Sequence, residues 1–493
     1  TADGRLLDRL LKTLPFSLTG SQLGVIAEVR RDLAAPRRMN RLLQGDVGSG
    51  KTLVALAAML MTVEAGWQAA LMAPTQILAE QHYLNFKRLL GPLGIPIALR
   101  TGSRNEDTAP LPLFANALAR DSESGQEAVR GSASAPDATH RRASRRAIPG
   151  VPPEDHAAKS PEQRMRDALV PRIIVGTHAL LYETSEFEDF GLVVIDEQHK
   201  FGVLQRARLI ARGEAPDVLV MTATPIPRTL TQTLYGDLDV STLREKPANR
   251  GAVQTAVRER GKLPEVVDFV RKQLDRGRQA YIVYPLVDES SKLAAKSATA
   301  EFEKWKPLLA PHSIGLLHGR MSPEEKEETV AKFHSGHLAA LVTTTVIEVG
   351  VDVPNANIMV VESAERFGLA QLHQLRGRIG RGEHKSYCIL LHDPKTDETS
   401  REKLALLEKI TDGFEIAEAD FRLRGPGDLL GTAQTGLPPL KLGDLFRDAE
   451  TMKDTAALAA SLFAEDPEMR KPEHLALRAF VTRSKAKITA SAG

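Results

Sequence analysis

The sequence predicts an α/β protein with two tandem lobes, each built on a parallel sheet, followed by a helical C-terminal region. Short apolar runs bounded by turn signals alternate with helical patterns through most of the 493 residues. Runs without polar alternation are typical of strands buried on both faces of a parallel sheet. The runs form two sets, separated by a charged stretch at 243–251 that contains proline and glycine. This composition is typical of a linker.

We place the first lobe at 1–243, the second at 244–402 and the helical region at 403–493. The first set of apolar runs comprises "MNRLLQG", "WQAALMAP", "RIIVGT", "LVVIDE" and "DVLVMTAT". The second set comprises "QAYIVYPLV", "SIGLLHG", "AALVTTTVI", "NIMVVES" and "SYCILLHD". Strands that alternate with helical patterns in this way indicate βαβ units.

The interval 104–159 interrupts the first lobe and is rich in Ser, Ala, Arg, Pro and Glu. Such a composition cannot bury enough apolar surface to offset the entropy of ordering the chain. We therefore predict a disordered insertion. Its "RRASRR" run is either a DNA-phosphate contact or a solvated basic stretch, and solvated runs are the commoner case.

Composition excludes several classes of protein. The net charge of +2 and pI of about 8.5 are only weakly basic and do not by themselves indicate nucleic-acid binding. The single cysteine, Cys388, excludes an internal disulfide or a Cys-rich zinc site, and its apolar run predicts a buried core thiol. No apolar run reaches the roughly 18 residues that a membrane-spanning helix needs, so none is expected.

The stretch "GDVGSGKT" at 45–52 matches the phosphate-binding pattern G-x-x-x-x-G-K-[ST]. It follows a predicted strand and precedes an Ala- and Leu-rich helical pattern, which is the context that supports the motif. Backbone amides of such a loop hold phosphates, Lys51 is expected to reach the β- and γ-phosphates, and Thr52 to bind Mg²⁺. The loop residues predicted to bind ATP are Gly45, Asp46, Val47, Gly48, Ser49, Gly50, Lys51 and Thr52.

Two further motifs complete a predicted ATPase. In "VVIDEQH", Asp196 ends a hydrophobic run and is expected to bind Mg²⁺, while Glu197 is placed to activate the attacking water. In "QLHQLRGRIGRG", at 371–382, three arginines can stabilise charge on the γ-phosphoryl group. The predicted cofactors are ATP and Mg²⁺. The predicted catalytic residues are Lys51, Asp196, Glu197, Arg378 and Arg381.

These motifs, in this order, resemble those of superfamily 2 helicases, and specifically the RecG family of bacterial fork-remodelling DNA translocases. The resemblance runs from about Leu6 to the final helices, apart from the insertion. It implies two RecA-like lobes and an ATP-hydrolysing helicase of the 3′–5′ type that remodels stalled forks and Holliday junctions in recombination and repair. "LPFSLTGSQ" is similar to the family's Q motif, in which Phe16 would pack by the base and Gln22 would read the adenine edge. In "TTTVIEVGVDVPNA", Gly350 and Asp352 would face the nucleotide.

Other segments are similar to the family's DNA-binding or coupling motifs, among them "MAPTQILAEQH", "TGS", "GTHALL", "MTATPIPRTL" and "LLHGRM". The resemblance implies duplex DNA gripped on its phosphates across both lobes. For any one loop, Ser and Thr are equally typical of turns and helix caps, so both interpretations stay open. The residues assigned to DNA binding or coupling are Pro74, Thr75, Thr101, Gly102, Thr177, His178, His199, Thr222, Thr224, His318, Arg320 and Thr344.

The stretch "FEIAEADFRLRGPGDLLGTAQTG" resembles the TRG motif, which the family links to duplex translocation. Its glycines and proline predict a kinked loop instead of an ordinary helix. Arg422, Arg424 and Gln434 are expected to couple ATP hydrolysis to DNA. The departures from the usual family residues are Asp428, Ala433 and Thr435.

Alternatives remain at this stage. Mfd, the transcription-repair coupling translocase, shares this motor. Two further alternatives are a DNA-binding module with a decayed motor, and an RNA helicase. The RecG family also has an N-terminal OB-fold wedge for branched DNA, and we expect the present sequence to lack it.

The resemblance further implies how the protein works in the cell. The expected partners are duplex and branched DNA, and replication-fork proteins through regions outside this chain. A monomer in the bacterial cytoplasm, associated with the nucleoid, is expected. An organelle is the alternative location if a signal precedes this sequence.

Overall fold

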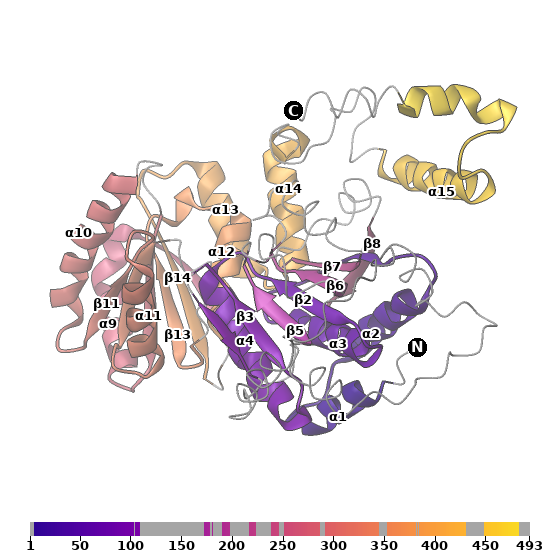
Figure 1. Ribbon diagram of the computed structural model, residues 1–493. Helices are drawn as coiled ribbons and strands as arrows, with labels where there is room; N and C mark the ends of the chain where they lie inside the picture. The colour runs from indigo at the N-terminus through magenta and orange to yellow at the C-terminus, as the bar shows by residue number, and fades with distance from the viewer. Residues whose placement is uncertain are drawn as a thin grey trace, which may run out of the picture.

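Two sheets of mainly parallel strands lie side by side, and a set of C-terminal helices follows them (Figure 1). The structure is a computed structural model. It describes residues 4–102, 104–108, 172–177, 180, 190–197, 216–222, 238–245, 251–285, 291–344, 353–380, 382, 384–429 and 448–482. Apart from its first residues, the insertion expected at 104–159 lies outside this part of the chain.

The first lobe is built on a sheet of eight strands in the order β4-β3-β5-β2-β6-β7-β1-β8. Its neighbouring strands run parallel, except that β4 is antiparallel to β3. The strands are β1 (Asn40–Gly45), β2 (Gln68–Met72), β3 (Ile97–Arg100), β4 (Asn105–Asp107), β5 (Ile173–Gly176), β6 (Phe190–Ile195), β7 (Asp217–Thr222) and β8 (Asp239–Leu243). All five strands predicted for this lobe are present, as β1, β2, β5, β6 and β7.

The helices cover this sheet because their apolar faces pack against its apolar strands. Helix α3, directly after the P-loop, consists largely of the good helix formers Ala, Leu and Met and is buried on most sides. Helix α2 starts with a capping box in which Thr19 and Gln22 exchange side-chain and backbone hydrogen bonds. The helices are α1 (Arg5–Thr13), α2 (Gly20–Ala34), α3 (Lys51–Glu64) and α4 (Gln76–Leu90).

The second lobe is built on six parallel strands in the order β11-β12-β10-β13-β14-β9. The five predicted strands are confirmed as β10 to β14, and the edge strand β9 was missed. The strands are β9 (Val253–Glu259), β10 (Gln279–Tyr284), β11 (Ile314–Leu317), β12 (Ala340–Thr344), β13 (Ala356–Val361) and β14 (Ser386–His392). The helices are α9 (Leu263–Leu274), α10 (Ser291–Leu309), α11 (Pro323–His334) and α12 (Leu369–Arg376).

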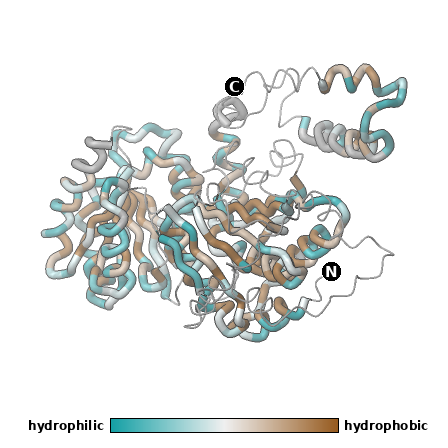
Figure 2. The backbone as a smooth tube through the Cα atoms, in the orientation of Figure 1, coloured by the Kyte–Doolittle hydropathy of each residue, from teal (hydrophilic) through white to brown (hydrophobic). Residues whose placement is uncertain are grey.

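The hydropathy colouring shows the apolar strands inside both lobes and the hydrophilic residues mostly on the covering helices (Figure 2). Cys388, on β14, is buried and free, as expected, and burial raises the pKa of its thiol to about 12. Within the described residues, no helix is both long and apolar enough to cross a membrane. Short 3₁₀ helices lie at Gly91–Leu93, Arg260–Lys262, Ala364–Arg366 and Pro472–His474.

The C-terminal helices are α13 (Glu398–Lys409), α14 (Gly413–Leu429) and α15 (Ala449–Glu465). Leu404 and Leu407 of α13 and Ile416 of α14 belong to the hydrophobic core of the second lobe. The boundary placed at 402 therefore falls inside α13, which packs as part of this lobe. Figure 1 shows α14 beside both lobes, whereas α15 stands away from them.

The expectation of a kinked loop around "RGPGD" is wrong for the backbone up to Leu429. Helix α14 continues through Gly425, Pro426 and Gly427. Pro426 lies in the last turn, where a missing N–H removes only one hydrogen bond to the turn before it. Upstream, buried Ile416 and Phe421 anchor the helix, so packing overrides the weak local propensity.

Candidate active site

The P-loop joins β1 to α3 through a turn whose backbone conformation favours glycine. Gly48 and Gly50 have φ of 78° and 85°, in the left-handed region. At Gly50 a Cβ atom would also stand 2.2 Å from Nε2 of Gln22. Helix α3 begins at the next residue, Lys51, so its unsatisfied N-terminal amides lie at the end of the loop. This arrangement suits the binding of phosphates.

Lys51 and Gln22 hold the loop from two sides. The Lys51 ammonium is buried and donates to the backbone oxygens of Gly45, at 2.7 Å, and Asp46, at 3.0 Å. Gln22 donates from Nε2 to the Ser49 oxygen at 2.8 Å and accepts from the Thr19 amide at 2.9 Å. The Gln22 amide thus links α2 to the P-loop, which sequence reasoning did not foresee, and its contact with adenine stays a prediction. Phe16, its expected companion, is 48% exposed.

Asp196 follows β6 and is held by two donors. His82 on α4 donates from Nε2 to Oδ2 at 2.9 Å, and the Glu197 amide donates to Oδ1 at 3.0 Å. Burial acts to raise the pKa of Asp196, but the His82 hydrogen bond and the nearby His82 and Lys51 charges outweigh it. The pKa of Asp196 is therefore lowered, and this side chain stays an ionised carboxylate.

His82 was not predicted as a site residue. It shares the buried face of α4 with Leu78, Ala79, Tyr83 and Phe86. A histidine at an apolar-face position is a signal in the sequence, but its partner lies 114 residues away. Periodicity alone could not identify that partner.

Glu197 has φ of 51°, which places a residue with a side chain in the left-handed region. Such conformations cost of the order of 1–3 kcal/mol and cluster at functional sites. The conformation lies directly after the predicted Mg²⁺ ligand, at the residue predicted to activate water. The backbone strain is thus located where sequence analysis placed the chemistry.

The residues present fit a magnesium ion. Thr52 and Asp196 offer a hydroxyl and an ionised carboxylate, the hard oxygen donors that Mg²⁺ prefers, and Mg²⁺ commonly uses one or two carboxylates with substrate phosphates. No cluster of three or more His, Cys, Asp or Glu that could hold a metal occurs among the described residues. A site shared between few protein ligands and nucleotide phosphates is consistent with that finding.

The second lobe meets the P-loop through the end of α12. A Cβ atom on Gly377 would stand 2.5 Å from Cβ of Val47, so the two backbones approach closely. Arg378 is the next residue and therefore lies at this contact between the lobes. Arg376, also on α12, donates to the backbone oxygens of Ile410 and Thr411 after α13. The third arginine of the motif, Arg381, lies outside the described residues.

Several hydroxyls predicted to contact DNA phosphates are engaged inside the protein. Oγ1 of Thr75 caps α4 by accepting from the Leu78 amide at 3.4 Å. Oγ1 of Thr101 donates to the Arg104 oxygen at 3.0 Å, closing the turn between β3 and β4. For these two residues the structure shows turn and cap chemistry. Three other predicted DNA-contacting threonines are buried in or beside strands: Thr177, Thr222 and Thr344.

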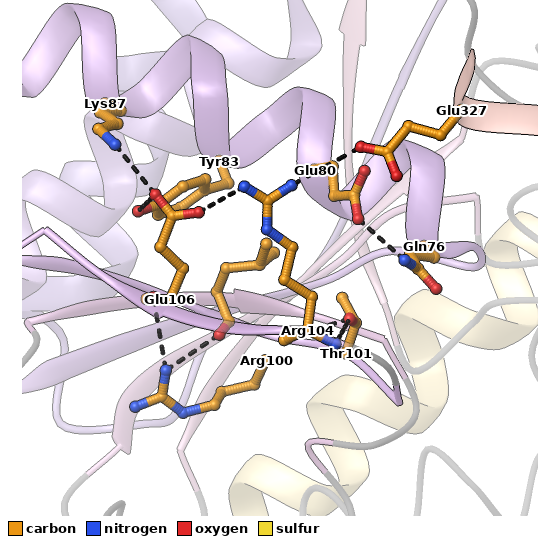
Figure 3. A network of polar contacts seen from close by, with 10 residues as sticks. Gln76, Glu80, Tyr83, Lys87, Arg100, Thr101, Arg104, Glu106 and Glu327 are labelled. Atoms are coloured by element: carbon orange, nitrogen blue, oxygen red, sulfur yellow. Dashed lines mark hydrogen bonds and ion pairs between the residues drawn. The ribbon is translucent and has the colours of Figure 1, made fainter. Parts of the chain in front are cut away.

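Beside this turn, a polar network links the two lobes (Figure 3). Glu106 on β4 accepts from Tyr83 and Lys87 at 3.0 Å each and from Arg104 at 2.7 Å. Arg104 also lies 3.9 Å from Glu327 on α11 of the second lobe. The Lys87 hydrogen bond, assisted by Tyr83 and Arg104 against burial, lowers the pKa of Glu106. Burial, with Glu106 nearby, raises the pKa of Tyr83.

The remaining predicted DNA residues are less constrained. Nδ1 of His318 accepts from the Arg320 amide at 3.3 Å, and burial followed by the Lys326 charge lowers the pKa of His318. The Arg422 side chain is 75% exposed and lies 3.7 Å from Glu418. For Arg424 the structure gives only its place on α14. Pro74 and Gly102 lie in the loops after β2 and β3. Predicted residues outside the described part are His178, His199, Thr224, Gly350, Asp352 and Gln434.

Protein-family models match the chain in three parts. The DEAD/DEAH box helicase model matches residues 21–113 and 139–233. The helicase conserved C-terminal domain matches residues 261–383. The fold and these matches thus place the chain in the class of proteins with two helicase-type lobes and a P-loop. The model for ATP-dependent DNA helicase RecG, domain 3, C-terminal, matches residues 410–491.

Curated relatives place the chain more narrowly. It is 44% identical to the ATP-dependent DNA helicase RecG of Synechocystis over 479 residues, covering 97% of the chain and 52% of that protein. It is 43% identical to RecG of Escherichia coli K12 over 476 residues, covering 96% of the chain and 62% of that protein. The chain is a RecG-family sequence that corresponds to the helicase portion of these proteins. It spans about half to three fifths of their length.

Solved structures agree with this assignment. The structure of RecG bound to a three-way DNA junction matches with a TM-score of 0.65 and 40% identity over 92% of the chain and 52% of that protein. A DUF1998 helicase, MrfA, bound to DNA, matches with a TM-score of 0.54 but only 17% identity, covering 83% of the chain and 54% of that protein. The second match supports the two-lobed helicase fold alone.

Proposed function

We propose that the chain is the motor of a RecG-type enzyme that uses ATP hydrolysis to move along double-stranded DNA and remodel branched DNA. The observation that carries this proposal is that the P-loop lies close to the ionised Asp196, through Lys51, and to the end of α12 from the second lobe. The alignments with two RecG relatives, both named ATP-dependent DNA helicases, cover nearly the whole chain. The RecG-specific match at 410–491 favours this function over an Mfd-like one.

We assign the principal steps of hydrolysis to the following residues. The α3 N-terminus and Lys51 bind the phosphates. Thr52 and Asp196 would hold Mg²⁺, which supplies charge neutralisation on the phosphates when it is bound. Glu197 orients and deprotonates the attacking water. Arg378 follows Gly377, which lies against the P-loop residue Val47, and we assign it the stabilisation of the developing negative charge.

Because this constellation draws on both lobes, it assembles only when they close. ATP favours closure to the extent that it binds the closed state more tightly. We propose that closure and reopening move the lobes along duplex phosphates, with Arg422, Arg424 and the rest of the TRG-type segment transmitting the motion. We further propose that the motor acts as a monomer. We propose bacterial chromosomal DNA as its substrate, because the matched RecG relatives are bacterial.

The test is ATP hydrolysis by the purified chain with no DNA, with linear duplex and with a three-way junction. We expect stimulation by duplex DNA. Glu197→Gln is expected to retain ATP and DNA binding and to lose turnover by at least about 10²-fold. Unchanged DNA-stimulated hydrolysis in this variant would sink the assignment, and wild-type protein without any hydrolysis would support a decayed motor.

Translocation needs a separate measurement. Displacement of a third strand from a DNA triplex reports movement along duplex without strand separation. We expect Arg424→Ala to leave hydrolysis largely intact and to impair this displacement. If Arg424→Ala lowers hydrolysis and displacement equally, or lowers neither, the TRG-type segment has only a structural role.

A further inference from the structure

A chain of three buried polar side chains crosses from the P-loop into the second lobe. Asp46 follows β1 in the first lobe, whereas His373 and Arg376 lie on α12 in the second. Each of the three residues is only 5% exposed. Buried polar groups need hydrogen-bond partners, and these three residues supply partners to one another.

The first two links fix the orientation of the histidine. Oδ1 of Asp46 receives a hydrogen bond from Nε2 of His373 at 2.5 Å and another from the Val47 amide at 2.7 Å. Nη2 of Arg376 donates to Nδ1 of His373 at 2.8 Å. Since a guanidinium group has only donors, Nδ1 must accept and Nε2 must carry the proton that reaches Asp46.

The last link joins α12 to the corner between α13 and α14. Arg376 donates from Nη1 to the backbone oxygens of Leu407, at 3.0 Å, and Ile410, at 2.8 Å. Nη2 donates to the Thr411 oxygen at 3.2 Å. A buried cation therefore satisfies the carbonyls at the end of α13, which would otherwise lack partners.

Helix α14 starts at this corner and lies against the His373–Asp46 hydrogen bond that joins the two lobes. Asp412 caps it by accepting from the amides of Phe414, at 2.7 Å, and Glu415, at 3.1 Å. At Gly413, the first residue of the helix, a Cβ atom would stand 2.6 Å from Nε2 of His373 and 3.0 Å from Oδ1 of Asp46. The helix that carries the TRG-type segment thus rests directly on the hydrogen bond between the lobes.

We propose that Asp46, His373 and Arg376 form a relay that makes the placement of α14 depend on the state of the P-loop. Any shift of the P-loop relative to α12 must either carry this helix with it or break a short buried hydrogen bond. Fully satisfied buried networks resist partial disruption, so the relay favours two discrete arrangements over gradual loosening. His373 and Arg376 act here as positioning residues. The inference rests on the proposed function, in which α14 transmits motion to DNA.

Hydrogen–deuterium exchange of α14 tests the relay without requiring either hydrolysis or DNA. The full chain is compared without nucleotide and with ADP plus beryllium fluoride, and amides at 413–423 are followed. We expect the wild-type chain to show nucleotide-dependent exchange there. His373→Ala should lose this response while its affinity for the nucleotide changes by less than about threefold. An unchanged response in His373→Ala, or no response in the wild-type chain, would overturn the relay.

Matched variants separate the relay from general destabilisation. His373→Gln keeps one donor and one acceptor on the side chain and should restore the response. His312→Ala removes a histidine that lies 2.9 Å from Asp275 elsewhere in the second lobe, and it should behave as wild type. If His373→Gln fails while folding and binding nucleotide normally, hydrogen bonding is not the means of coupling and the proposal is wrong.

A wedge variant tests the same contact without removing any member of the relay. Gly413→Ala pushes a methyl group against His373 and Asp46 and should weaken the α14 response. Gly261→Ala is its control, because a Cβ atom there would meet nothing within 4 Å. Equal behaviour of the two alanine variants would count against the relay.

Stimulation of hydrolysis by duplex DNA connects the relay to the motor. We expect His373→Ala to reduce the ratio of DNA-stimulated to basal hydrolysis by at least about fivefold, the lower end of typical coupling between sites. If the wild-type chain shows no stimulation by DNA, the proposed function fails while the exchange experiment still decides the relay. If stimulation in His373→Ala equals that of the wild type, coupling through this path is excluded.

Discussion

Two buried histidine–aspartate pairs lie at the P-loop, one beside it and one including its residue Asp46, and they differ in what they connect. His82 and Asp196 both belong to the first lobe, where α4 packs on the sheet that carries β6. His373 and Asp46 belong to different lobes. The chemistry is the same in both pairs, a ring nitrogen bonded to a buried carboxylate. The His82–Asp196 pair, within one lobe, holds the Asp196 carboxylate in a fixed position. The His373–Asp46 hydrogen bond, between lobes, depends on how the two lobes are placed relative to each other.

The comparison predicts which experiments separate chemistry from coupling. A change in the first pair should lower hydrolysis whether or not DNA is present. A change in the second pair should mainly alter how hydrolysis responds to DNA. The following predictions run from the largest expected effect to the smallest.

Asp196→Asn should have the largest effect, because it removes the ionised oxygen that would bind Mg²⁺. We expect turnover to fall by at least about 10²-fold both with and without DNA. The measurement is steady-state hydrolysis across a Mg²⁺ titration. A loss confined to the DNA-stimulated rate would contradict the distinction between the two pairs.

His82→Ala should have an intermediate effect, since His82 bonds to Asp196, the proposed metal ligand, and would act on the metal only through it. Loss of such supporting partners typically costs about 10–100-fold in metal affinity or activity. We expect the Mg²⁺ concentration for half-maximal hydrolysis to rise, with partial recovery at high Mg²⁺. His82→Gln, which keeps a donor, should be milder. Equal defects in the two variants, insensitive to Mg²⁺, would indicate a packing role for His82.

Glu362 sharpens the comparison because it is a buried carboxyl group that follows β13 in the second lobe. Burial raises the pKa of Glu362, with Arg260 only partly opposing it at 3.8 Å. Its Oε2 has no hydrogen-bond partner among the described residues. Asp196, with His82 and Lys51 nearby, has a lowered pKa instead. The difference lies in the partners and not in the depth of burial.

This raised pKa has a consequence for stability. Because the folded state holds the Glu362 proton more tightly, the free energy of unfolding falls as pH rises from the unfolded value near 4.5 through the folded pKa. Glu362→Gln removes that term, so its effect on the free energy of unfolding should be more stabilising at neutral pH than at pH 4. Urea denaturation at several pH values is the measurement. Destabilisation at neutral pH would mean that the ionised form is well accommodated.

Arg104→Ala should have the smallest effect. The Arg104–Glu327 contact also joins the lobes, but its side chains are 46% and 63% exposed, and exposed ion pairs contribute about 0–1 kcal/mol. We expect a change in nucleotide affinity of less than about threefold at low salt, disappearing at high salt. Glu327→Gln, a change at the other partner, should match it. A larger, salt-independent change in nucleotide affinity would mean that the exposed Arg104–Glu327 contact couples the lobes as strongly as we propose for the buried His373–Asp46 pair.

Sequence patterns predicted the parts of the site that are local in the chain. The P-loop lies within eight consecutive residues, and its glycines, lysine and flanking elements identify it without knowledge of the fold. Ten apolar runs predicted ten strands because parallel strands buried on both faces leave a continuous apolar signal. Edge strands such as β8 and β9 escaped because their exposed faces carry polar residues and weaken that signal.

Only the tertiary structure identified the histidine partners. His82 and His373 lie 114 and 327 residues from their aspartates, and no spacing rule relates residues that far apart. It also showed that Arg376 bonds to carbonyls near α14 and that this helix continues through Pro426, because packing on the lobe core outweighs local propensity. The sequence by itself determined where the nucleotide-binding motifs lie and predicted their chemistry, since these motifs are short. The fold alone decided which distant side chains connect that chemistry to the rest of the motor, since this depends on how two separately folded lobes meet.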